Sequence, residues 1–175
     1  PQVDAAMRAF GFPLGPYQVA DLAGLDIAWA RRKRLAPTRD PSERYVAIGD
    51  VHCEAGRYGQ KNGRGYYAYQ TGSTVAVEDP EVTRINELER KRKGITPRQF
   101  LDGEIARRCL LAMVNEGARL LEEGVAQRPS DIDVAMVHGF AFPRWWGGPM
   151  KWADLAGLLL VRQDLITLTP EDPAL

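Results

Sequence analysis

The sequence lacks the features that mark several common classes of protein. Its 175 residues carry 23 basic and 23 acidic side chains, so it has none of the basic excess expected of a nucleic-acid-binding protein. Its two cysteines, Cys53 and Cys109, are too few for a disulfide framework, and with only two histidines they show no zinc-site spacing. No apolar run reaches the roughly 18–20 residues that a membrane span needs, and no signal-peptide pattern opens the sequence. We therefore expect a folded globular protein of a reducing compartment.

One stretch of sequence occurs twice in the same order. Val-Asp-Ala-Ala-Met is matched by Ile-Asp-Val-Ala-Met, and an aromatic, glycine and proline patch follows each copy. The matched segments are 3–7 with 132–136, 10–13 with 140–143, 15–16 with 148–149, and 21–25 with 154–158. This many matches in one order predict an internal duplication. The alternative is two unrelated helical stretches of similar composition.

Apolar periodicity predicts an all-α protein. The clearest helical stripe lies in 102–126, where apolar residues recur at the spacing of one helix face. A threonine N-cap, proline and glutamine at 96–99 indicate that a helix begins there, and 169–172 opens another by the same pattern. The predicted helices are 3–10, 17–35, 80–93, 97–126, 131–139 and 150–165, with loops at 11–16, 36–65 and 140–149 and a short extended piece at 66–69.

The repeat predicts two domains, 1–78 and 79–175. The second copy is preceded by the long helix of 102–126, but the first copy starts at the position that follows this helix. We therefore expect the first module to lack its opening helix and the second to be truncated at its end. A complete active site is not expected within the chain.

Three local patterns could carry chemistry, but each has a simpler explanation. Residues 63–68 match the glycine pattern of dinucleotide-binding loops, which must follow a strand and open a helix, and neither is predicted here. His52, Cys53 and Glu54 are adjacent in sequence, so their side chains point in different directions and a nucleophile pair is not expected. His138 lies near the end of a predicted helix, where stabilisation of the helix end is an equally good explanation.

Two runs of basic residues and one cluster of tryptophans are more typical of solvated or packing surfaces than of ligand-binding sites. The basic runs 31–34 and 90–93 lie on predicted helices and are typical of solvated faces, although phosphate binding is an alternative. Trp145, Trp146 and Trp152 surround a Gly-Gly-Pro turn, which favours packing over a ligand cage. In a duplicated protein this patch and residues 10–16 are natural places for the two modules to meet.

Several longer motifs resemble the C-terminal helical domains of 3-hydroxyacyl-CoA dehydrogenases from multifunctional fatty-acid β-oxidation enzymes. The first copy carries Phe-Gly-Phe-Pro-Leu-Gly-Pro and a glycine-rich segment ending in Gly-Tyr-Tyr, and the second carries Asn-Glu-Gly-Ala-Arg. The matching segments are 10–16, 21–26 and 56–67 in the first copy, and 115–119, 128–133 and 147–150 in the second. The resemblance covers residues 1 to about 157, and the tail departs from it.

The resemblance implies two tandem copies of the helical domain typical of the C-terminal part of 6-phosphogluconate dehydrogenase, related by a pseudo-two-fold axis. In such enzymes an upstream enoyl-CoA hydratase/isomerase region is followed by a Rossmann domain that binds NAD. A His–Glu pair there takes the hydroxyl proton of an L-3-hydroxyacyl-CoA while hydride passes to NAD. The resemblance places this pair, a serine and an asparagine upstream of Pro1, so it implies no catalytic residue and no bound cofactor in this chain. Arg107 takes the asparagine's place in the second copy, which implies a structural role.

The same resemblance gives the chain a substrate-facing loop. Phe12, Pro13, Leu14, Gly15 and Pro16 match the loop that borders the acyl-CoA cleft. The implied partners are the acyl-CoA substrate, the upstream Rossmann and hydratase domains and, in some assemblies, a thiolase subunit. The implied location is the cytoplasm in a bacterium and the peroxisome in a eukaryote. The competing hypotheses are a non-enzymatic helical assembly module and, with less support, a stand-alone CoA-binding protein.

Overall fold

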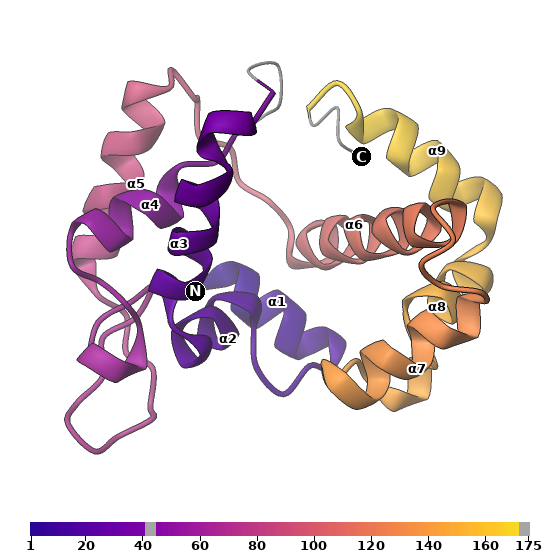
Figure 1. The fold of residues 1–175 in the computed structure, drawn as a ribbon, viewed down its shortest axis with the longest axis horizontal. Helices are drawn as coiled ribbons and strands as arrows, with labels where there is room; N and C mark the ends of the chain where they lie inside the picture. Colours follow the sequence, from indigo (N-terminus) through magenta and orange to yellow (C-terminus); the bar gives the residue numbers. More distant parts are fainter. Residues whose placement is uncertain (41–44, 172–175) are drawn as a thin grey trace. The chain divides into compact units, whose positions relative to one another are not determined.

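The structure is a computed structural model that describes residues 1–40 and 45–171. These residues form nine α-helices and three short 3-10 helices, and β pairing among them is limited to isolated bridges. The expected all-α class is therefore confirmed (Figure 1). The α-helices are α1 Gln2–Phe10, α2 Pro16–Ala23, α3 Leu25–Leu35, α4 Ile48–Glu54, α5 Pro80–Arg92, α6 Asp102–Glu122, α7 Pro129–Gly139, α8 Pro149–Ala156 and α9 Leu158–Leu168; the 3-10 helices are η1 Ala36–Thr38, η2 Gln60–Asn62 and η3 Arg144–Trp146.

The chain divides into two compact units, each built from two segments that are separate in sequence. The first unit comprises Pro1 and Leu14–Gln99 and contains α2 to α5. The second unit comprises Gln2–Pro13 and the described residues from Phe100 onward, so it contains α1 together with α6 to α9. The predicted modules 1–78 and 79–175 do not coincide with these units, and both the duplication and the module boundaries stay a prediction.

Helix α6 is the centre of the second unit. It packs against α1, α7, α8 and α9, and Figure 1 shows α1 beside it. The predicted stripe is correct in part. Ile105, Leu110 and Val114 are buried, whereas Cys109 and Met113 are only half-buried. The buried core of this unit consists of Leu110, Leu111, Val114, Phe142, Trp152, Ala153, Val161 and Leu168.

The first unit is a smaller helical array around a long irregular segment. Helix α4 packs against both α3 and α5, and α2 packs against α3 and η2. Buried apolar residues include Val82 and Ile85 on one face of α5. The segment 56–69 has no helix after η2 and only isolated bridges, so the predicted extended piece at 66–69 is not a regular strand.

Two predicted helices are interrupted by glycines at equivalent places in the repeat. The expected helix 17–35 breaks at Gly24, where φ is 98° and ψ is 116°, and the expected helix 150–165 breaks at Gly157, where the values are 91° and 113°. A positive φ strains residues with a Cβ, so glycine is the default there. The two predictions of unbroken helices were wrong, and the shared backbone conformation supports the duplication.

Two further expectations need correction. The helix predicted from residue 97 begins at Asp102, because 96–101 form no helix. The predicted loop 36–65 contains the helices η1, α4 and η2. Thr169 caps the end of α9 and is followed by a turn, while the remainder of the helix expected at 169–172 lies outside the described residues, as do 41–44.

Candidate functional site

The loop predicted to face substrate joins α1 to α2, and its first residue is anchored in the second unit. The half-buried ring of Phe12 lies 5.3 Å from that of Phe142, edge to face, and 6.1 Å from that of Phe10, measured between centroids. Phe10 also stacks on Trp146 at 5.5 Å. Aromatic pairs at these separations stabilise beyond the area that they bury. The cluster therefore fixes the start of the loop.

The remaining loop residues present an apolar surface. Pro13, Leu14 and Pro16 are exposed, whereas Gly15 is buried and precedes the first turn of α2. The Gly15 amide donates to Oε1 of Gln18 at 3.1 Å, which stabilises the end of the loop. The exposed side chains of Pro13 and Leu14, between the two fixed ends, and that of Pro16 at the start of α2 are suited to contact an apolar ligand.

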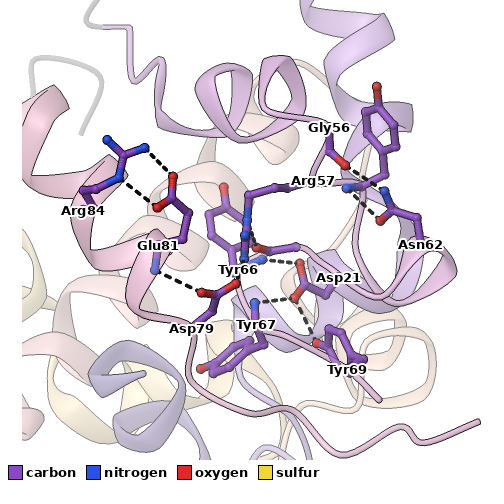
Figure 2. A network of polar contacts seen from close by, with 12 residues as sticks. Asp21, Gly56, Arg57, Asn62, Tyr66, Tyr67, Tyr69, Asp79, Glu81 and Arg84 are labelled. Carbon is purple, nitrogen blue, oxygen red and sulfur yellow. Dashed lines mark hydrogen bonds and ion pairs between the residues drawn. The ribbon is translucent and has the colours of Figure 1, made fainter. Parts of the chain in front are cut away.

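A buried carboxylate holds the segment 56–69 onto α2 (Figure 2). Asp21 is fully buried and accepts hydrogen bonds from the amides of Tyr66 at 2.8 Å and Tyr67 at 3.0 Å, and from the hydroxyl of Tyr69 at 2.9 Å. Burial raises the pKa of Asp21, although these three donors oppose the shift. Gly65 packs so closely that a Cβ there would overlap Asp21 Oδ1.

A second buried charge extends this network towards α5. Arg57 donates to the Gly65 carbonyl at 2.8 Å. It also donates to Oδ2 of Asp79 at 2.7 Å, and Figure 2 shows both of these side chains. Asp79 in turn accepts from the Glu81 amide at 3.0 Å and so caps the first turn of α5. Burial by itself would raise the pKa of Asp79, but the hydrogen bonds from Arg57 and the Glu81 amide, together with the charges of Arg57 and Arg64, lower it. The network therefore links α2, the segment 56–69 and α5.

The neighbours His52 and Cys53 lie on α4 and are both buried. Burial lowers the pKa of His52 to about 4, with Arg57 adding to the effect and Asn86 opposing it. Burial likewise raises the pKa of the Cys53 thiol. A catalytic cysteine needs a thiolate stabilised by a cationic neighbour, and these two shifts favour the uncharged forms. Both residues therefore serve packing, and His52 contacts the ring of Tyr66 at 4.8 Å.

The basic residues form ion pairs or lie in solvent. In the run 31–34, Arg32 pairs with Asp50 at 2.6 Å and Lys33 lies over the Trp29 ring at 3.5 Å. The run 90–93 is exposed. Arg107, which the resemblance placed at a catalytic asparagine's position in the second copy, forms an ion pair with Asp164 of α9.

The residues 63–68 do not have the local structure of a dinucleotide-binding loop. They follow the 3-10 helix η2, and the structure assigns no helix after them until Pro80. Gly63 adopts a left-handed conformation with φ of 78°, and the next residues form isolated bridges. Pyrophosphate binding needs the amides of a helix N-terminus, which this segment does not provide.

A comparison with protein families decides the relationship. The model of the "3-hydroxyacyl-CoA dehydrogenase, C-terminal domain" family matches residues 1–69 and 103–168, well over half of the chain. The chain belongs to this family. The family resemblance predicted from the sequence motifs is thus confirmed.

Individual relatives agree with the family match. The chain is 44% identical to the peroxisomal bifunctional enzyme of Danio rerio and 40% identical to that of Homo sapiens, over 94% and 98% of its own length. A peroxisomal fatty acid beta-oxidation multifunctional protein of Arabidopsis thaliana is 39% identical over 89% of the chain. The chain spans about a quarter of the length of these relatives, at 24%, 25% and 22%.

A solved structure also matches. The dehydrogenase part of multifunctional enzyme 1 from C. elegans aligns with a TM-score of 0.62 and 30% identity, covering 81% of this chain and 31% of that one. The helical fold of this chain is therefore shared with part of that protein.

Residues 1–40 and 45–171 offer no group of acidic, histidine and cysteine side chains that could hold a metal ion. None of the helices in this part of the chain is long and apolar enough to cross a membrane. The network around Asp21 was missed by sequence reasoning. Its one available signal was the glycine-rich run 56–65, because glycines allow close approach of the backbone to another group.

Proposed function

We propose that this chain is the C-terminal part of an NAD-dependent L-3-hydroxyacyl-CoA dehydrogenase of fatty-acid β-oxidation. The observation that carries the proposal is the family match over both halves of the chain. In the proposed reaction the 3-hydroxyl of the acyl-CoA loses its proton to a base, and hydride leaves C3 for NAD. The products are a 3-oxoacyl-CoA, NADH and a proton.

The chemistry is divided between this chain and segments outside it. NAD and the His–Glu pair belong to a Rossmann domain upstream, and an enoyl-CoA hydratase region lies further upstream. A thiolase subunit would take the 3-oxoacyl product in assemblies that contain one. The chain alone is therefore inactive in this proposal. Its own contribution is to complete the acyl-CoA cleft and to hold the helical domains together.

The α1–α2 loop supplies the substrate-binding residues. Pro13, Leu14 and Pro16 are exposed and apolar, so they can contact an acyl or pantetheine chain without burying an unpaired polar group. Phe12 and Gly15 fix the two ends of the loop, through the ring of Phe142 and the side chain of Gln18. A loop held at both ends loses little conformational entropy when it binds a ligand.

The second copy of the repeat replaces a partner subunit. Two observations support this arrangement: Gly24 and Gly157 share an unusual backbone conformation, and equivalent phenylalanines, Phe12 and Phe142, contact each other. Equivalent residues meet in this way beside a two-fold axis. Carrying both halves on one chain keeps them at a high effective concentration.

The relatives named above suggest a location. Those from animals and plants are named as peroxisomal, so we place the intact protein in the peroxisome of a eukaryotic host and in the cytoplasm of a bacterial one. A fluorescent fusion of the intact protein, imaged with a peroxisomal marker, tests this. Diffuse fluorescence in a eukaryotic host contradicts it.

The catalytic proposal is tested by following NADH oxidation with acetoacetyl-CoA. The intact protein turns over, and the 175-residue chain stays at background. In the intact protein Leu14→Asp raises KM roughly ten-fold or more, because a charge replaces an apolar contact worth about 1–3 kcal/mol. Leu159→Asp, at an exposed apolar residue of α9, is the matched control and leaves KM unchanged. Turnover by the chain alone, or an unchanged KM for Leu14→Asp, contradicts the proposal.

A further inference from the structure

The three tryptophans of the second unit differ sharply in their surroundings. Trp152 is 7% exposed and belongs to the core, and the half-buried Trp146 stacks on Phe10 at 5.5 Å. The ring of Trp145 is instead 70% exposed. The packing role predicted for this cluster therefore suits two of its members. The third presents an aromatic surface that the described part of the chain leaves open.

The exposed tryptophan lies in a stretch that is longer than the segment it matches. One residue separates Pro13 from Gly15, whereas four residues separate Pro143 from Gly148. The 3-10 helix η3 Arg144–Trp146 is formed within these additional residues. The α1–α2 loop connects its two helices without such an insertion, so the connection itself does not require η3. Additional loop residues of this kind commonly carry a function of their own.

Hydrogen bonds and buried neighbours fix the turn that carries Trp145. The Trp146 amide donates to the Pro143 carbonyl at 3.1 Å, and the Gly147 amide donates to the Arg144 carbonyl at 3.0 Å. Pro143 is buried and Trp146 is half-buried, while the two residues between them are exposed. An aromatic side chain on an ordered turn loses little conformational entropy when it binds a ligand.

The Trp145 ring lies against the start of the α1–α2 loop, within the same compact unit. Gly11 has a φ of 128°, and a Cβ there would overlap Cζ2 of Trp145 and lie 3.1 Å from Cγ of Pro143. Gly11 directly precedes Phe12, the first residue that we propose to border the acyl-CoA cleft, and the following Pro13 is exposed. The indole therefore continues the proposed substrate surface from this loop onto η3.

An unpaired cation adjoins this ring in sequence. Arg144 is exposed, and it forms no ion pair with an acidic side chain in the described part of the chain. By contrast, Arg107 of the same unit is paired with Asp164. Bases stack on aromatic side chains, and phosphates pair with guanidinium groups. An exposed indole next to an unpaired arginine thus suits a ligand that combines a purine ring with phosphate groups.

We propose that Trp145 and Arg144 bind the nucleotide end of acyl-CoA, with the adenine ring on the indole and a phosphate on the guanidinium. This inference rests on the acyl-CoA substrate of the proposed function and extends the binding surface beyond the α1–α2 loop. Coenzyme A joins a phosphorylated adenosine diphosphate to an uncharged pantetheine chain. An apolar loop that is continuous with an aromatic and cationic turn matches both parts of this molecule.

Two substrates of different length separate the two parts of the ligand. In the intact protein Trp145→Ala raises KM for acetoacetyl-CoA roughly five-fold or more and leaves kcat unchanged, because base stacking is lost. The KM for acetoacetyl-pantetheine, which lacks the nucleotide, stays the same. Leu14→Asp instead raises KM for both substrates. Phe140→Ala is the matched control, because it removes a ring of similar exposure, 69%, at the end of α7 and leaves both KM values unchanged.

Conservative variants separate recognition from folding. Trp145→Phe keeps a flat ring and recovers most of the affinity for acetoacetyl-CoA, whereas a damaged fold would not recover. Arg144→Gln raises the same KM roughly three-fold at low ionic strength, and the effect fades at high salt because ions screen exposed charges. Arg162→Gln, at an exposed arginine of α9, is the control and leaves KM unchanged.

Fluorescence gives a measurement that does not depend on the reaction. Adenosine 3′,5′-bisphosphate quenches part of the indole emission of the intact protein, and the quenched part is missing in Trp145→Phe. An inactive protein that still shows this quenching contradicts the proposed function alone. Three results overturn the inference in an active protein: no quenching that depends on Trp145, an equal rise in KM for acetoacetyl-CoA and acetoacetyl-pantetheine in Trp145→Ala, or a rise in KM for NADH instead. The last result would assign the ring to the dinucleotide.

Discussion

Phe12 and Phe142 pack edge to face, with their ring centroids 5.3 Å apart and their planes at 78°. They hold the same place in two similar segments, Phe-Gly-Phe-Pro and Phe-Ala-Phe-Pro, which we propose to be copies of one repeat. Gly11 and Ala141, which precede them, share a positive φ of 128° and 55°. Contact between equivalent residues is the signature of an interface that pairs a surface with itself. The loop that we propose for substrate binding is thus anchored on the segment that matches it in sequence.

This pairing predicts a measurable coupling between the two rings. Phe142→Ala should lower the free energy of unfolding by about 3–5 kcal/mol, because Phe142 is almost completely buried. A double-mutant cycle with Phe12→Ala should give a coupling of about 0.5–1.5 kcal/mol in urea denaturation. Phe140→Ala, at an exposed ring of the same loop, should change stability by less than about 0.5 kcal/mol. Strictly additive effects would mean that the contact does not form.

The carboxylate of Asp21 should be essential for the first unit. Asp21→Ala leaves the buried Tyr67 amide, the part-buried Tyr66 amide and the Tyr69 hydroxyl without their acceptor, and each buried donor so lost costs about 1–3 kcal/mol. The repeat provides the control, because the equivalent Asp154 is exposed. Asp154→Ala should be neutral within about 0.5 kcal/mol. Guanidinium or urea titration of both variants measures the difference, and equal stabilities would refute the role of Asp21.

The close approach at Gly65 predicts opposite effects for two glycine-to-alanine changes. Gly65→Ala forces a methyl group onto Asp21 Oδ1 and should destabilise by about 1–3 kcal/mol, as overpacking does. Gly103→Ala lies in α6 with no atom near the added methyl, and should stabilise by up to about 1 kcal/mol. In thermal melts, the midpoint temperature of Gly65→Ala should be lower, and that of Gly103→Ala higher, than that of the parent protein. A Gly65→Ala protein as stable as the parent would show that segment 56–69 lies further from α2.

The sequence was informative where the signal is local. Apolar periodicity predicts the centre of α6, and the helix class follows from it. The cap pattern at 96–99 predicted a start that does not form, because a cap contributes only about 1 kcal/mol and other contacts decide the boundary. Helix α4 was missed since it has seven residues, two of them β-branched and one glycine. It is held by packing against α3 and α5, and no local pattern reports that.

The polar network could not be predicted because its members are distant in sequence. Asp21 and its donors Tyr66, Tyr67 and Tyr69 are separated by 45–48 residues. No local pattern distinguishes Asp21, which is buried, from Asp154, which holds the matching place in the second segment and is exposed. The positive-φ breaks at Gly24 and Gly157 did have a local signal, since each is the only glycine within its predicted helix. The assignment of Phe12–Pro16 as a substrate-facing loop was implied by the family resemblance alone, and its role in binding stays a prediction.

The buried imidazole of His52 should make stability depend on pH. Its pKa is about 4 in the folded chain, because burial disfavours the charged form, and close to 6.5 when exposed. Between these values the unfolded chain binds a proton that the folded chain does not, so stability is complete above about pH 6.5 and is lost towards pH 4. The shift corresponds to roughly 3 kcal/mol.

His52→Gln removes the titrating group and should flatten the urea midpoint between pH 7 and pH 4.5 relative to the parent. His138→Gln, at the exposed histidine of α7, is the control and should retain the parent's full dependence. Acid loss of stability from carboxylates is common to all three proteins, so the difference between the two variants isolates His52. An equally steep loss in His52→Gln would show that water reaches this imidazole and that the ring carries its proton in the folded chain.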